Sequence, residues 1–110
     1  MGVHFVDGVM AADRKRLREE IPTAAEAFVA DLGALNAEAR VKGFRLGHQD
    51  VWRESPLSYR QEPVLERFYA QVIYLYDRKN GLVAHVDLSK EQLVRIWGDA
   101  QFTGALENWR

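Results

Sequence analysis

The sequence predicts an α+β fold in which helices pack on a small antiparallel sheet. Apolar residues recur at every third or fourth position across residues 24–42, which is typical of an amphipathic helix. Residues 68–87 join β-branched and aromatic residues to a central turn, which favours a β-hairpin. At 110 residues, 47% hydrophobic and 28% charged, the chain fits a single domain spanning residues 1–110.

Two segments are expected ahead of the long helix. Within residues 1–10, the stretch "VHFV" favours a short edge strand or a docked tail. Residues 11–20 favour a short helix, although they are polar and offer little beyond Leu17 for packing. Pro22 is expected to end this helix, because the residue before a proline avoids the helical region.

A long helix is expected from about Ala24 to about Lys42. Thr23 and Glu26 have the spacing of a capping box at its start, and Gly43 supplies the left-handed residue that ends it. Seven alanines and one glycine lie along this helix, and small side chains permit the close approach of a second helix. We therefore expect a homodimer whose two-fold interface lies on this helix, formed by Phe28, Leu32, Leu35 and Ala39.

The sheet is expected to be built on the hairpin. Residues 44–62 favour one irregular strand or two short ones. The next strand is expected from Tyr69 to Tyr76, with a turn at Asn80-Gly81 and a return strand from Leu82 to Asp87. Both faces of the first hairpin strand are apolar, which predicts a cover on each side. The long helix is one expected cover, and the last helix or a partner is the other.

A C-terminal helix is expected after Ser89. Gln92 stands three residues further on, at the spacing of a second capping box, and Gly98 is expected to end the helix. Residues 99–110 then form a C-terminal extension.

The most basic stretch is "RKRLR", residues 14–18. Asp13, Glu19 and Glu20 flank it, so residues 13–20 carry four positive and three negative charges, and the whole chain carries −1. A nucleic-acid-binding arm needs an excess of basic charge with aromatic residues nearby. We therefore interpret this stretch as a solvated helical face and expect no nucleic-acid partner.

Two further features concern the environment of the protein. No apolar run approaches the roughly 20 residues that span a bilayer, so no membrane association is expected. The chain has no cysteine, which fits a reducing compartment, and we expect a cytoplasmic protein.

Signals for catalysis or for a bound cofactor are weak. The three histidines, His4, His48 and His85, lack the H-E-x-x-H spacing of a zinc-binding helix, and no serine lies in a G-x-S-x-G motif. We therefore expect no catalytic residue, no metal and no cofactor. The alternative is a small enzyme or ligand-binding domain with a pocket between helix and sheet, lined by His48, Asp50, Tyr59 and Tyr74.

Aromatic residues are numerous for so short a chain, with three tryptophans and four tyrosines. These rings fill the core or form an exposed patch, and Trp, Tyr and Arg are the residues that anchor protein interfaces. We expect a non-enzymatic regulator that blocks or sequesters a larger protein partner, as antiactivators, immunity proteins and inhibitors do. The expected anchors are Trp52, Arg53, Tyr59, Arg60 and Trp109.

Overall fold

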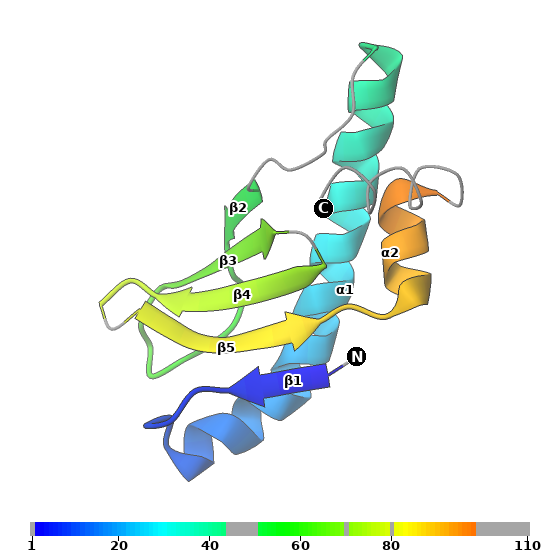
Figure 1. Ribbon diagram of the computed structural model, residues 1–110. Coiled ribbons are helices and arrows are strands. Elements are labelled where there is room, and N and C mark those ends of the chain that lie inside the picture. The colour runs from blue at the N-terminus through cyan, green and yellow to red at the C-terminus, as the bar shows by residue number, and fades with distance from the viewer. Residues whose placement is uncertain (1, 44–50, 70, 80, 99–110) are drawn as a thin grey trace.

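The computed structural model describes residues 2–43, 51–69, 71–79 and 81–98 and confirms the α+β class (Figure 1). The expected N-terminal edge strand is present, whereas the expected extension 99–110 lies outside the described residues. The elements in chain order are β1 (Gly2–Phe5), α1 (Ala11–Val41), β2 (Val51–Glu54), β3 (Val64–Tyr69), β4 (Val72–Asp77), β5 (Gly81–Asp87) and α2 (Lys90–Trp97).

The five strands form one antiparallel sheet in the order β1-β5-β4-β3-β2. β2 to β5 follow one another as a meander, and β1 adds to its far end beside β5. β1 and β2 are therefore the two edge strands, and α1 carries the chain from one edge to the other (Figure 1).

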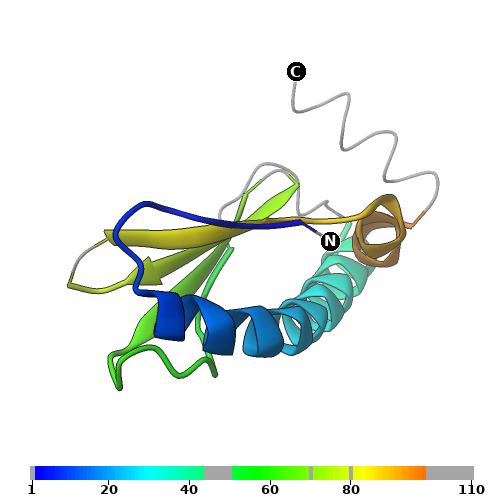
Figure 2. The same cartoon turned by 90° about the horizontal axis from the view of Figure 1, so that it is seen from below.

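α1 is a single helix of 31 residues, so the expected division into helices at 11–20 and 24–42 is wrong. Pro22 lies inside α1, where a proline costs about 3 kcal/mol in an ordinary helix. The helix continues because Leu17 before the proline and Phe28 after it are buried in the same core. Figure 2 shows α1 curving along the sheet, as expected for a helix that contains a proline.

The ends of the helices agree better with the sequence. Thr23 lies inside α1, so its expected capping box is wrong, but Gly43 adopts a φ of +89° just beyond the end of α1, as predicted. At α2, the Ser89 hydroxyl accepts a hydrogen bond from the Gln92 amide at 3.2 Å. The Gln92 side chain accepts one from the Ser89 amide at 2.8 Å, which confirms the second capping box.

The hairpin region contains one reversal more than expected. Tyr69 on β3 pairs directly with Val72 on β4, so the predicted strand from Tyr69 to Tyr76 is divided between two strands. No glycine or proline marks this reversal in the sequence. The second reversal falls where it was expected, and Gly81 supplies its positive φ of +88°.

Both helices that the structure describes lie on the same face of the sheet. Figure 2 shows α1 along this face, and Trp97 of α2 packs against Phe68 of β3 with ring centroids 6.2 Å apart. Among the described residues no helix covers the opposite face, so the cover expected on both sides is present on one. The most deeply buried apolar residues of the core are Leu17, Ile21, Phe28, Val29, Leu32, Phe68, Ile73, Ala84, Val86 and Ile96.

Candidate functional site

The side chains of β3 and β4 alternate between the helix-covered face and the opposite one. Val64, Glu66 and Phe68 of β3 are buried, while the residues between them are half-buried or exposed. β4 shows the same alternation. We call the uncovered side the open face, and its larger side chains are His4, Trp52, Leu65, Arg67, Tyr69, Val72, Tyr74, Tyr76, Leu82 and His85.

One row of the open face crosses all five strands. The strand register places His4 opposite His85, His85 opposite Tyr74, Tyr74 opposite Arg67, and Arg67 opposite Trp52. The His4 and His85 rings stack at 4.7 Å, and the Tyr74 ring lies 6.1 Å from His85. We call these five residues the transverse row. They form a continuous line of flat side chains, because directly opposed residues on neighbouring strands are close enough to touch.

Arg67 is the cationic centre of this row. Its guanidinium lies 5.5 Å from the Trp52 ring, 5.2 Å from Tyr69 and 5.9 Å from Tyr74. Tyr76 extends the aromatic surface, with its ring 5.4 Å from Trp52. Each contact has the geometry of a cation–π or aromatic pair, so the surface is preorganised. Trp52 is nevertheless 49% exposed and Tyr69 is 43% exposed.

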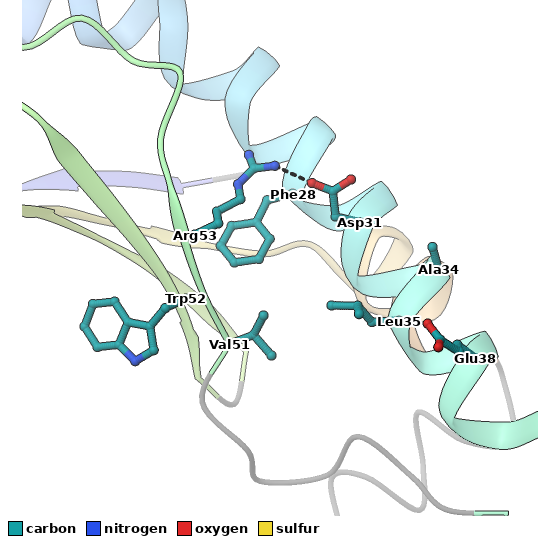
Figure 3. Close-up of a pocket in the computed structure, with 8 residues that line it drawn as sticks. All are labelled: Phe28, Asp31, Ala34, Leu35, Glu38, Val51, Trp52 and Arg53. Carbon is teal, nitrogen blue, oxygen red and sulfur yellow. Dashed lines mark hydrogen bonds and ion pairs between the residues drawn. The ribbon is translucent and has the colours of Figure 1, made fainter. Parts of the chain in front are cut away.

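Trp52 therefore lies where an interface anchor would have to lie, but Arg53 does not. Consecutive strand residues point to opposite faces, and Arg53 is turned toward α1. Its Nε donates a hydrogen bond to the Glu66 carboxylate at 2.7 Å, and its Nη2 donates one to the Ala24 carbonyl at 2.8 Å. It also pairs with Asp31 of α1 (Figure 3).

The partner of Arg53 in the sheet, Glu66, is fully buried. Its second carboxylate oxygen accepts a hydrogen bond from the Ser55 hydroxyl at 2.7 Å. Burial of a carboxylate is costly unless it is paired, and both oxygens of Glu66 are satisfied here. The Arg53–Glu66 pair thus joins the edge strand β2 to β3 and to α1, on the helix-covered side of the sheet and away from the open face.

Tyr59 and Arg60 also serve the fold. Tyr59 is buried in the core, which removes it from the surface where an anchor would act. The Arg60 guanidinium lies 4.9 Å from the Tyr59 ring and donates a hydrogen bond to Asp13 of α1 at 3.0 Å. That hydrogen bond raises the pKa of Arg60. The remaining expected anchor, Trp109, lies outside the described residues.

The expected dimer face is largely occupied within the chain. Phe28, Leu32 and Ala39 are buried, and Leu35 alone of the four is exposed, at 41%. The small residues of α1 have an internal use, because a Cβ on Gly33 would lie 3.1 Å from the Arg95 carbonyl of α2. Gly33 therefore permits the close approach of α2, and homodimerisation stays a prediction.

A groove of about 380 Å³ does lie between α1 and β2 (Figure 3), but its walls differ from those expected. Tyr59 is in the core, Tyr74 is on the opposite side of the sheet, and His48 and Asp50 lie outside the described residues. The groove is lined by Phe28, Asp31, Ala34, Leu35, Glu38, Val51, Trp52 and Arg53. The guanidinium of Arg53 is paired with Glu66 and Asp31. The groove is therefore amphipathic, and its lining residues include no catalytic constellation.

The basic stretch 14–18 makes structural contacts. Arg16 pairs with Asp13 at 3.1 Å, and its Nε donates a hydrogen bond to the Ser58 carbonyl. Glu20 accepts a hydrogen bond from the Ser58 hydroxyl at 2.8 Å. These contacts attach the loop before β3 to α1.

Arg67, His4 and His85 were not among the predicted site residues. Strand alternation places Arg67 on one face with Leu65 and Tyr69, but the burial that distinguishes the two faces is seen only in the structure. The histidines become neighbours only through the pairing of β1 with β5, which sequence spacing does not reveal. Among the residues that the structure describes, His4, His85 and Asp87 form a group whose ligand atoms lie close enough together to hold a metal ion.

Comparisons with protein-family models, with characterised proteins and with solved structures find no significant match to this chain. Within the described ranges, neither helix has the length and apolar character needed to cross a lipid bilayer.

Proposed function

We propose that this protein is a non-enzymatic protein-binding regulator that blocks or sequesters a larger protein partner through the open face of its sheet. The observation that carries the proposal is the transverse row with its flanking tyrosines, on a face that no described helix covers. Large aromatic side chains around an arginine are the composition of interface hot spots. The absence of cysteine fits action in a reducing compartment such as the cytoplasm.

The charge of the open face favours a protein over a nucleic acid. Arg67 is its central cation, while Glu54 and Asp87 place carboxylates on the same side of the sheet. A chain of net charge −1 offers no long-range attraction to a phosphate backbone. A protein surface needs no such excess of positive charge, because apolar contact and a few directed polar groups supply most of the binding energy.

A comparative capture experiment tests the proposal. The tagged wild-type chain, the double variant Trp52→Ala Tyr69→Ala and the control Val41→Ala are each incubated with nuclease-treated lysate of the source organism. Trp52 and Tyr69 lie on the open face, whereas Val41 is an exposed apolar residue at the end of α1. Circular dichroism first establishes that all three chains are folded.

We expect one protein to be recovered in stoichiometric amount by the wild type and the control and to be lost with the double variant. Recovery of that protein by all three chains would overturn the proposal, and so would the absence of any stoichiometric protein. Recovery of RNA or DNA from untreated lysate, with binding that falls steeply as salt rises, would replace it with a nucleic-acid function.

A further inference from the structure

We propose that His4, His85 and Asp87 bind one zinc ion at the β1–β5 end of the open face. His4 and His85 stand opposite each other on the two paired strands, and Asp87 follows two residues later on the same side of β5. One ligand atom from each of the three side chains lies within 4.8 Å of the other two. The group is accessible, with about half of the His4 and Asp87 side chains exposed.

The donor set matches the chemistry of zinc. Two imidazole nitrogens and a carboxylate oxygen are typical zinc ligands, with bonds of about 2.0–2.2 Å. Tetrahedral coordination at these lengths separates ligand atoms by about 3.4 Å, so ligand atoms that lie within 4.8 Å of one another must come closer by rotation of their side chains to share one ion. Imidazole ligands suit zinc and other late transition metals, whereas Mg²⁺ and Ca²⁺ prefer oxygen ligands.

The three side chains already interact without an ion. Nε2 of His4 lies 2.8 Å from Oδ2 of Asp87, and the His4 and His85 rings stack. Zinc would replace the hydrogen that links Nε2 of His4 to Oδ2 of Asp87. A neutral imidazole then moves that proton to its other nitrogen, and a charged imidazole releases one proton to solvent. Protons therefore compete with the metal, and binding weakens at acid pH.

A second observation concerns Gly2, which stands opposite Asp87 in the register. A Cβ at this position would lie 3.2 Å from Nε2 of His4 and 3.8 Å from Oδ2 of Asp87. The glycine thus keeps open the space beside both ligand atoms, where an ion and a fourth ligand must fit. An alanine would narrow that space without removing a ligand.

Zinc at this position would also act on the fold. β1 is an edge strand whose neighbour in the sheet is β5, and the ion would cross-link the two. Three protein ligands leave one coordination position for water or for a ligand from a partner. The site does not depend on the proposed protein-binding function, and either proposal can fail without the other.

The test is a calorimetric titration of the chelator-treated, untagged 110-residue chain with ZnCl₂ near neutral pH. We expect one zinc per chain with micromolar or tighter affinity, and a thermal midpoint that rises by several degrees in excess zinc. The Co²⁺-loaded protein should show the visible absorption of a four-coordinate site. Mg²⁺ in excess should not compete.

Four variants locate the ion. His85→Gln and Asp87→Asn should weaken zinc binding by at least tenfold, and Gly2→Ala should weaken it with all ligands retained. The matched control Asp7→Asn, an exposed carboxylate outside the group, should bind as the wild type does. The metal-free thermal midpoint of each variant verifies that it is folded. Undetectable zinc binding by the wild type, or binding that all four variants retain, would overturn the proposal.

Discussion

The guanidinium of Arg67 lies over the indole ring of Trp52, 5.5 Å from its centroid, on the side of the sheet opposite the helices. The two residues are directly paired across β2 and β3. Because Trp52 is on the edge strand and remains half exposed, this pair presents a large, ordered ring without burying it. The contact joins the edge of the sheet to the tyrosines around Arg67 and gives the open face its continuity.

Arg53, the neighbour of Trp52, has the opposite role, and its removal should destabilise the fold. Arg53→Ala leaves the fully buried Glu66 carboxylate without its charged partner. We expect the free energy of unfolding, measured by urea denaturation, to fall by about 3–5 kcal/mol. The control Arg78→Ala breaks an exposed pair with Glu54 and should cost about 0–1 kcal/mol. Equal, small losses for the two variants would show that Arg53 does not hold β2 in place.

Pro22 tests the continuity of α1. In a continuous helix, Pro22→Ala restores a backbone hydrogen bond, and we expect the free energy of unfolding to rise by roughly 1–3 kcal/mol. Thr23→Ala supplies the control, because an interior threonine changes stability by only about 0.5 kcal/mol. If Thr23 capped a separate helix, its replacement would cost about 1 kcal/mol or more, and Pro22→Ala would give no gain.

The contact between the two helices should depend on pH. Hydrogen bonds from Arg95 and Gln92 of α2 lower the pKa of Glu26 of α1 below its ordinary value of 4.5. Because the lowered pKa belongs to the folded state, the contribution is complete above the ordinary value and is lost as pH falls through the folded pKa. Thermal midpoints of wild type and Glu26→Gln should therefore differ near neutral pH and converge as the pH falls below the folded pKa of Glu26. A gap of constant size would contradict this account.

The parts of the fold that were predictable rest on local signals. Ser89 and Gln92 cap α2, and Gly43 and Gly81 supply positive φ values, because each depends on neighbouring residues alone. The helix break predicted at Pro22 was wrong, because burial of the residues on both sides of Pro22 outweighs the local preference of proline against a helix. The reversal between Tyr69 and Val72 carries no turn residue and depends on the pairing of β3 with β4.

The site was predictable only in part. Strand alternation places Trp52 and Arg53 on opposite faces of β2, so these two neighbours cannot both be anchors on one face of the sheet. The transverse row could not be predicted from the sequence. Its residues are separated by up to 81 positions between His4 and His85, and the strand register of the whole sheet brings them together.

The most direct measurement of the central claim compares partner affinity and thermal midpoint for Trp52→Ala. With the protein captured as described above, we expect the dissociation constant to rise about 30-fold or more, as for a hot-spot tryptophan, while the midpoint moves by no more than about 2 °C. Val41→Ala should change neither quantity. An unchanged dissociation constant, or a fall in midpoint of about 8 °C or more, would contradict the claim, since Trp52 would then be irrelevant to binding or part of the core.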